Sequence, residues 1–345
     1  MSKRKFISLQ EAQPPFFVGI DLGGTNIKVG VVDNQGQPLS WLSIPTEDEK
    51  GPEDAARRMG EAVHHAVKKA KLNPRDVARV GLGSPGTMDI PAGMLINPVN
   101  LKGWDNFPIR DRVSFHCGLP VAFENDANAA AYGEFWAGAG KEYHSLVLFT
   151  LGTGIGCGII IGDFIVDGEN SHGAECGHVI VDSADDARMC GCGQRGHLEA
   201  YASATAVMKR AGELLAAGHK SSLARRLARA KDHDRNTKII FEEAEKGDKL
   251  ANQIVTETAR WLGIGTVNLL HTIDPNVVLL GGAMTFGGTA TKTGRRFLAR
   301  VLKEVRARAF PTIAQRIEIE YASLGGDAGF IGAAGIARLE HRKET

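Results

Sequence analysis

The feature that most constrains the fold is a strand, glycine turn and strand pattern that occurs twice in the 345-residue chain. The first copy spans 16–33 and turns at DLGGT (21–25), whereas the second spans 146–161 and turns at LGTGIG (151–156). Further helix and strand patterns follow each copy, and a repeated supersecondary unit indicates duplication. The sequence therefore predicts an α/β protein with duplicated lobes and a ligand-binding cleft between them.

Hydrophobic spacing and helix-end signals predict further elements. Pro52 stands at the start of a helix whose apolar residues recur at helical spacing, and a short strand is expected over 77–83. The same signals predict three helices and one buried strand in the second half: helices over 198–217, 250–272 and 327–340, and a strand over 276–280.

No low-complexity linker separates the lobes, so the repeat alone places the boundary. We expect an N-terminal lobe over 1–123, completed by a C-terminal helix over 325–345, and a larger lobe over 124–324.

Charge and composition narrow the possible partners. The chain has 41 basic and 40 acidic residues and a net charge of +1, which gives no electrostatic reason to expect nucleic acid or an anionic membrane. No apolar run of about 20 residues could span a bilayer, and residues 1–10 lack the apolar core of a secretory signal. Five cysteines, two of them in a Cys-x-Cys cluster, favour metal binding over disulfides. We therefore expect a cytoplasmic protein.

Two glycine motifs resemble a dinucleotide-binding loop but lack its context. GLGSPG (81–86) does not open a helix, and GCGQRG (191–196) has no strand before it. No P-loop motif is present. An oxidoreductase that uses a nicotinamide cofactor is therefore a weak alternative.

The DLGGT turn has the composition of a phosphate-binding loop. Asp21 ends a strand at the mouth of the turn, Gly23 and Gly24 leave backbone N–H groups accessible to phosphate, and Thr25 adds a hydroxyl. Lys28 can support charge on the next strand. Because Mg²⁺ prefers few carboxylates together with substrate phosphates, a single aspartate at this turn suits it. An ordinary Gly-Gly hairpin is the alternative, which the second turn at LGTGIG disfavours.

The segment ENDANAAAYGE (124–134) places Asn125 and Asp126 immediately before an alanine-rich helix. Such residues often cap helices, so one of them can cap while the other faces the ligand. A carboxylate there can accept the proton of an attacking hydroxyl. The spacing alone favours neither capping nor catalysis.

A third cluster has the composition of a zinc site. His178, Cys190, Cys192 and His197 supply two imidazoles and two thiolates, which is a complete tetrahedral ligand set. With no coordination position left for water, the Zn²⁺ would be structural. The alternative is that the cysteines are buried free thiols and His197 a surface residue.

Polar residues suited to a sugar lie around these motifs. Asn100, Glu175, His178 and Glu199 offer the acceptors and donors that several hydroxyl groups need. Trp104 could stack on a sugar ring, although a tryptophan after a loop glycine is more often packed in the core.

Taken together, these motifs resemble the ROK family of sugar kinases and sugar-responsive repressors, within the actin-like, hexokinase-like ATPase superfold. The likeness runs from DLGGT to DAGFIGAAGIA (327–337), and the stretch from GHVIVD to CGCGQRGHLEAYAS (177–203) is close to the signature of that family. It implies a hexose kinase that uses Mg·ATP, with glucose favoured as substrate and the sugar 6-hydroxyl as acceptor.

The resemblance also assigns roles to residues. Asp126 would be the catalytic base, and Asp21 would bind Mg²⁺. The sugar-binding set would be Asn100, Asn125, Asp126, Glu175, His178 and Glu199. The nucleotide- and phosphate-binding set would be Asp21, Gly23, Gly24, Thr25, Lys28, Gly152, Thr153, Gly154, Gly281 and Gly282, with the last two bordering the adenosine. A homodimer or homotetramer is expected from the same likeness.

One residue departs from the family pattern, because His197 stands where most members have a third cysteine. Histidine is an accepted zinc ligand, so a structural Zn²⁺ is still expected. About fifteen residues precede the first strand, too few for the DNA-binding domain of the family's repressors, which favours an enzyme. A non-catalytic sugar-binding regulator, polyphosphate as donor, and N-acetylmannosamine, fructose, mannose or allose as substrate remain alternatives.

Overall fold

The computed structural model describes residues 5–98, 101–230 and 236–345, which form two compact units. Unit 1 comprises Met1–Leu146, Gly158–Ala174 and Ala322–Thr345, and unit 2 comprises Val147–Cys157 and Glu175–Tyr321. This division differs from the boundary expected after residue 123, because helix α3 (Asp126–Ala137) belongs to unit 1. The reason is packing: α3 lies along α11 (Ala328–Glu344), the C-terminal helix of the same unit.

Unit 1 is built on a five-stranded sheet of order β3-β2-β1-β4-β7. The strands are β1 (Phe16–Leu22), β2 (Asn26–Val32), β3 (Pro38–Pro45), β4 (Val77–Ser84) and β7 (Val121–Asn125). β1 pairs antiparallel with β2 and parallel with β4, and β4 pairs parallel with β7. A small hairpin of β5 (Thr87–Asp89) and β6 (Met94–Asn97) leaves the sheet after β4.

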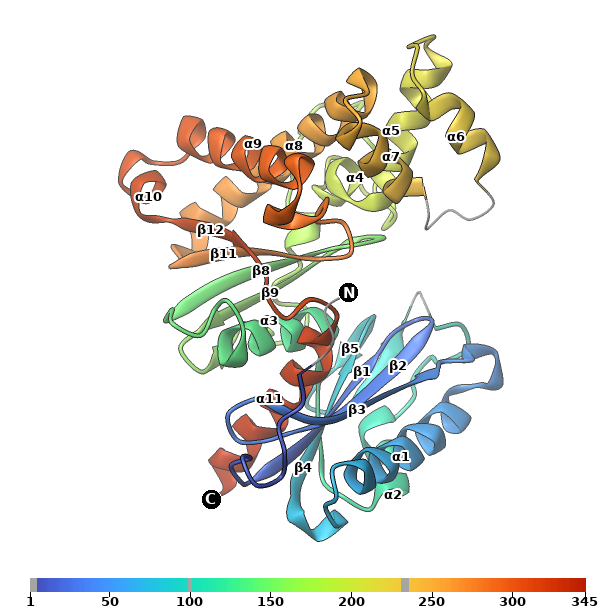
Figure 1. Ribbon diagram of the computed structural model, residues 1–345, viewed down its shortest axis with the longest axis vertical. Coiled ribbons are helices and arrows are strands. Elements are labelled where there is room, and N and C mark those ends of the chain that lie inside the picture. The colour runs from blue at the N-terminus through green and yellow to red at the C-terminus, as the bar shows by residue number, and fades with distance from the viewer. Residues whose placement is uncertain (1–4, 99–100, 231–235) are drawn as a thin grey trace. The chain divides into compact units, whose positions relative to one another are not determined.

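Side-chain alternation along β1 explains how helices cover both faces of this sheet. Val18 and Ile20 pack in the apolar core with α1 (Pro52–Lys69) and α2 (Ile109–Cys117) on one face. Gly19 points to the other face, where a Cβ atom would lie 1.7 Å from the backbone oxygen of Phe330 in α11. The small residues of β1 and β4 therefore let α11 pack directly on the backbone of the sheet (Figure 1).

The second sheet also has five strands, in the order β10-β9-β8-β11-β12. They are β8 (Ser145–Leu151), β9 (Ile155–Ile161), β10 (Phe164–Ile165), β11 (Val277–Gly282) and β12 (Glu318–Tyr321). If the five strands of each sheet are numbered in the order in which they occur along the chain, both sheets have the spatial order 3-2-1-4-5. The duplication predicted from the two glycine turns therefore extends to the topology.

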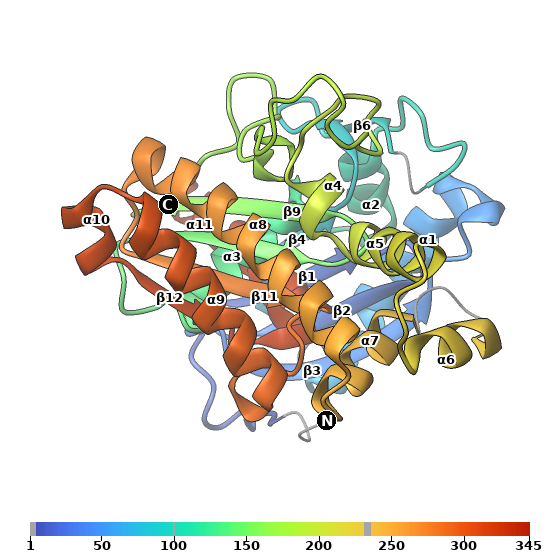
Figure 2. The ribbon, with the colours of Figure 1, turned by 90° about the horizontal axis from the view of Figure 1, so that it is seen from above.

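Unit 2 also contains a group of helices (Figure 2). Its helices are α4 (Glu199–Ala202), α5 (Ala204–Ala216), α6 (Leu223–Arg229), α7 (Asn236–Glu245), α8 (Lys249–Ile273), α9 (Lys292–Arg308) and α10 (Pro311–Arg316). The single helix expected over 198–217 is divided at Ser203, whose backbone is extended and whose side chain caps α5. α8 packs closely on α9, because a Cβ atom at Gly263 would lie 2.6 Å from the side chain of Glu304.

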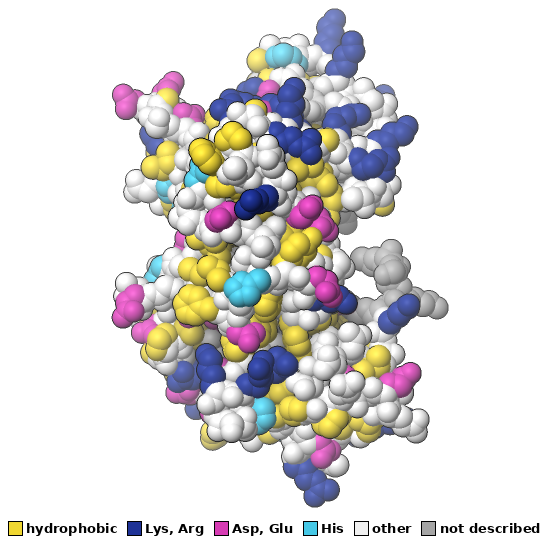
Figure 3. All heavy atoms as spheres, turned by 90° about the vertical axis from the view of Figure 1, so that its left-hand side faces the viewer, with side chains coloured by type: hydrophobic (Ala, Val, Ile, Leu, Met, Phe, Trp, Pro, Cys, Tyr) yellow, Lys and Arg dark blue, Asp and Glu magenta, His cyan; other side chains and the backbone are white. Residues whose placement is uncertain are grey.

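The expectations about surface and cysteines can be compared with the described residues. No helix among them has the length and apolar character to cross a membrane. Acidic and basic side chains both occur on the face shown in Figure 3, in keeping with the net charge of +1. The cysteines are free thiols, of which Cys117, Cys157 and Cys176 are buried as expected of small core residues. Trp104 is fully buried, so it is a core residue and does not present its ring to a sugar.

Candidate active site

The DLGGT segment forms the tight turn between β1 and β2 in unit 1. The turn closes through the N–H of Gly23, which donates to the backbone oxygen of Asn26 at 3.0 Å. A Cβ atom at Gly23 would lie 2.9 Å from the same oxygen, so the close turn favours glycine. Gly24 and Thr25 are exposed at its tip. The backbone of Thr25 is anchored because its oxygen accepts from the N–H of the buried Thr46 at 2.9 Å.

Asp21 lies at the base of this turn, on the same face of β1 as Gly19. Lys28, its partner in the β1–β2 register, donates from Nζ to Asp21 Oδ2 at 2.9 Å and to the backbone oxygen of Gly326 at 3.1 Å. A Cβ atom at Gly329 would lie 2.5 Å from the carboxyl carbon of Asp21. The carboxylate is therefore half-buried against the start of α11, with Lys28 holding one oxygen.

Mg²⁺ would fit this turn through the chemistry of its donors. The ion takes one or two protein carboxylates and completes its shell with water and substrate phosphates. Asp21 supplies a carboxylate whose Oδ2 binds Lys28, which leaves Oδ1 as the oxygen for a metal.

Of the two residues at the start of α3, Asn125 provides the cap. Asn125 is the N-cap, and its Oδ1 accepts from the N–H groups of Ala127 at 2.9 Å and Asn128 at 3.3 Å. Asp126 follows as the first residue of the helix and is half-buried. Because the cap is provided by Asn125, the carboxylate of Asp126 is not needed for that role.

A buried acid precedes this pair. Glu124 is 4% exposed, and its Oε1 accepts from the N–H of Asn125 at 2.8 Å and from Asn128 Nδ2 at 3.0 Å. Burial raises the pKa of Glu124 to about 7, although both hydrogen bonds oppose the change. The Oδ1 atom of Asn128 is buried and has no hydrogen-bond partner among the described residues.

The second glycine turn, between β8 and β9, is the counterpart in unit 2. The N–H of Gly152 donates to the oxygen of Gly154 at 3.0 Å, and Thr153 is exposed at the tip. Gly282, with φ of +87°, lies against the end of β8, where a Cβ atom would be 2.4 Å from the oxygen of Leu151. Its buried neighbour Gly281 precedes it in β11. The structure thus brings the predicted phosphate and adenosine residues of this unit together.

Glu199 connects this turn to the cysteine cluster. Its Oε2 accepts from the N–H of Ile155 at 3.0 Å, and a Cβ atom at Gly154 would lie 2.3 Å from Oε2. Its Oε1 accepts from Cys190 Sγ at 3.4 Å. Since each carboxylate oxygen has two lone pairs, Glu199 retains capacity to accept from a further hydroxyl.

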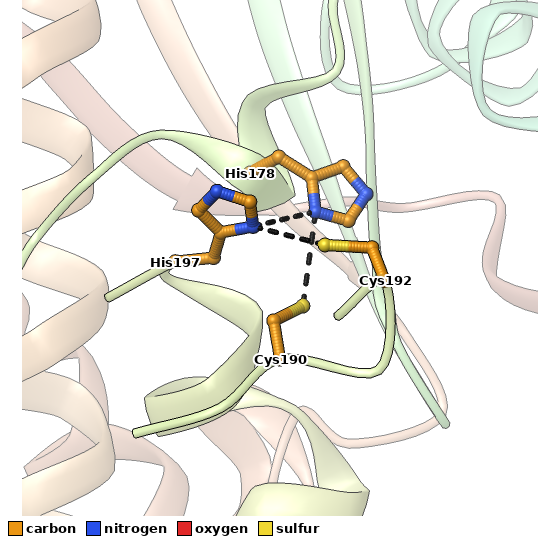
Figure 4. Close-up of side chains that lie close together, drawn as sticks. All are labelled: His178, Cys190, Cys192 and His197. Atoms are coloured by element: carbon orange, nitrogen blue, oxygen red, sulfur yellow. Dashed lines mark hydrogen bonds between the residues drawn. The ribbon is translucent and has the colours of Figure 1, made fainter. Parts of the chain in front are cut away.

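The four predicted zinc ligands converge. Figure 4 shows the side chains of His178, Cys190, Cys192 and His197 pointing toward one another, and their ligand atoms all lie within 4.8 Å. His178 Nδ1 is 3.2 Å from His197 Nδ1 and 3.8 Å from Cys190 Sγ. Cys192 Sγ is 3.3 Å from His197 Nδ1.

These three separations are close to the edges of a zinc tetrahedron. Zn–N bonds of about 2.0–2.1 Å and Zn–S bonds of about 2.3 Å place neighbouring ligand atoms roughly 3.3–3.8 Å apart. Burial and the nearby His178 lower the pKa of His197, which favours the neutral imidazole that binds metal. Burial raises the pKa of Cys190 to about 12, so a cation would be needed to deprotonate this thiol. The donor set therefore fits Zn²⁺.

The same loop presents Glu175 and the other nitrogen of His178. Glu175 is exposed and immediately precedes the short 3₁₀ turn Cys176–His178, and its Oε2 lies 3.9 Å from His178 Nε2. His178 can therefore use Nδ1 for a metal and Nε2 for a substrate. Contacts independent of metal also hold the loop, because Tyr201 donates to Asp182 at 2.6 Å and accepts from the N–H of Arg188 at 2.8 Å.

Comparison with known proteins gives the family of the chain. The family model described as ROK family matches residues 17–340. A glucokinase of Thermotoga maritima is 34% identical over 324 residues, which cover 93% of this chain and 96% of that protein. The chain belongs to the ROK family.

Solved ROK structures share its fold. A ROK hexokinase from Thermus thermophilus has 34% identity and a TM-score of 0.78, over 95% of this chain and 99% of that one. A ROK family glucokinase from Streptomyces griseus, crystallised with glucose and AMPPNP, has 34% identity and a TM-score of 0.74, over 94% of this chain and 99% of that one. The predicted actin-like ATPase fold is thereby confirmed.

Two buried acids of this ROK protein, Glu124 at the end of β7 and Glu134 in α3, had no role predicted from the sequence. Both lie in the ENDANAAAYGE segment, and both are buried. The sequence did contain a signal that could have identified these acids, namely a charged residue within a run of small apolar residues. Such a residue needs hydrogen-bond partners when it is buried. Among the predicted sugar-binding residues, Asn100 lies outside the described residues.

Proposed function

We propose that this ROK protein is an ATP-dependent hexose kinase that transfers the γ-phosphoryl group of ATP to the 6-hydroxyl of glucose. Two glucokinases are among its relatives at 34% identity, one of them crystallised with glucose and AMPPNP. The observation that carries the proposal within the chain is the start of α3, where Asn125 caps the helix through its Oδ1 and Asp126 is the half-buried first helical residue.

In this proposal Asp126 accepts the proton of the attacking hydroxyl while the phosphoryl group transfers in line. The predicted sugar-binding residues are Asn100, Asn125, Asp126, Glu175, His178 and Glu199. Asp21 would hold Mg²⁺, and the ion would supply neutralisation of charge on the phosphates. Thr25 and Lys28 at the DLGGT turn, and Thr153 at the LGTGIG turn, are predicted to bind phosphate through their side chains. Gly281 and Gly282 are predicted to border the adenosine.

We propose that the histidine and cysteine cluster holds a structural Zn²⁺. Its effect on the site would run through Glu199, which contacts Cys190 with one oxygen and the LGTGIG turn with the other. It would also fix His178 and hence the neighbouring Glu175. A homodimer or homotetramer and a cytoplasmic location stay predictions.

An ADP-release assay across a panel of hexoses and N-acetylmannosamine, run with ATP and with polyphosphate, tests the function. We expect the highest kcat/KM with glucose and ATP. If glucose binds but no sugar elicits ADP release, the chain is a sugar-binding regulator and the proposal is wrong. If another sugar has a higher kcat/KM than glucose, that sugar is the substrate. If polyphosphate gives a higher kcat/KM than ATP, polyphosphate is the phosphoryl donor.

A further inference from the structure

Glu134 is a fully buried carboxylate in α3 that joins three segments of unit 1. Its Oε1 accepts from the N–H of Leu324 at 2.7 Å. Its Oε2 accepts from the N–H of Ser323 at 3.1 Å, from the hydroxyl of Ser323 at 3.2 Å and from the N–H of Ala139 at 2.9 Å. A buried carboxylate is stable only when several donors surround it, so these hydrogen bonds hold the 323–324 segment firmly to α3.

The same segment continues directly to the phosphate turn. Two residues after Leu324, the backbone oxygen of Gly326 accepts from Lys28 Nζ at 3.1 Å. Lys28 also donates to Asp21 Oδ2 at 2.9 Å. Gly329, three residues further on, packs so closely on the Asp21 carboxylate that a Cβ atom would lie 2.5 Å from its carbon. A continuous set of contacts therefore leads from Glu134 to Asp21.

We propose that Glu134 is a positioning residue for the nucleotide: it fixes the 323–326 segment, so that Gly326 and Lys28 hold the Asp21 carboxylate in one orientation for Mg·ATP. The inference rests on the proposed function in that Asp21 faces the metal and the phosphates. Glu134 itself lies inside unit 1 and would touch neither ligand.

The test is the variant Glu134→Gln, which keeps the size of the side chain. The amide nitrogen of glutamine donates and cannot accept, so it would face N–H donors of the 323–324 segment. The segment would therefore lose some of its hydrogen bonds to α3. Calorimetry with Mg²⁺ and AMPPNP, without sugar, should show binding weakened about tenfold, the low end for residues that support a metal ligand. In steady state, KM for Mg·ATP should rise while KM for glucose stays unchanged.

Asp33→Asn is the matched control. Asp33 is also a buried carboxylate of unit 1 that accepts three backbone N–H groups, those of Gln13, Gln35 and Gln37, at 2.9–3.0 Å. Its loss should lower the melting temperature without changing Mg·AMPPNP affinity.

Unchanged Mg·AMPPNP affinity in Glu134→Gln, or equal weakening in both variants, would overturn the inference. If Glu134→Gln gives no folded protein, Ser323→Ala decides instead, because it removes only the hydroxyl donor. A weaker affinity in that variant supports the inference, and a wild-type affinity refutes it. A wild-type chain that binds Mg·AMPPNP but releases no ADP with any sugar would refute the proposed function and not this inference.

Discussion

The buried acid Glu124 should make the stability of unit 1 depend on pH in the direction opposite to that of most carboxylates. It is 4% exposed, and burial raises its pKa from 4.5 to about 7. Because the folded state holds the proton more tightly than the unfolded state, the stabilising contribution is complete below pH 4.5. It decreases as the pH rises and is lost above about pH 7.

The size of the effect follows from the same values. A rise of the pKa from 4.5 to about 7 corresponds to about 3 kcal/mol, at roughly 1.4 kcal/mol per pH unit. Glu124→Gln removes the titration but keeps a group that can accept from Asn125 and Asn128. The free energy of unfolding of this variant, relative to wild type, should therefore increase by up to about 3 kcal/mol between acidic and neutral pH.

Urea denaturation at a series of pH values between 5 and 8 measures this difference, provided that the slope m is the same in both proteins. Glu142→Gln is the control, because its side chain is 81% exposed, and it should follow wild type at every pH. Parallel stability curves for Glu124→Gln and wild type across this range would refute the argument that Glu124 is protonated on burial.

Two further substitutions test the metal site and the helix packing. Elemental analysis should find about one Zn per chain, and Cys190→Ser should lower both metal content and glucose affinity, whereas the buried Cys117→Ser should keep the metal. Full activity of metal-free protein would contradict an essential role for zinc. Gly332→Ala should destabilise the chain by about 1–3 kcal/mol in thermal unfolding, because its Cβ would lie 1.6 Å from the oxygen of Ala129, whereas Gly212→Ala in α5, with no atom within 4 Å, should not. Equal stability of these two glycine variants would show that α11 can move away from α3.

The sequence could predict those parts of the fold that depend on local pattern. Both glycine turns connect the expected strands, the helix expected at Pro52 is α1, and 250–272 lies within α8. The grouping of His178, Cys190, Cys192 and His197 was predictable as well, because zinc-binding chemistry favours histidine and cysteine at short spacings.

Contacts between distant segments could not be predicted in the same way. Glu134 meets Ser323 across 189 positions, and nothing in either local sequence indicates the other. Helix α3 joins unit 1 through α11, whereas the repeat alone had suggested a boundary before α3. The break at Ser203 was also missed, because the apolar spacing continues through a residue whose side chain caps the next helix.

The central claim is that Asp126 removes the proton of the sugar hydroxyl, and Asp126→Asn tests it most directly. Calorimetry should show glucose binding close to wild type, while the ADP-release assay should show kcat reduced by about 10²–10⁴-fold. Asp111→Asn, at a carboxylate with a 64% exposed side chain in α2, should keep the wild-type kcat. A near-normal kcat in Asp126→Asn would contradict the account.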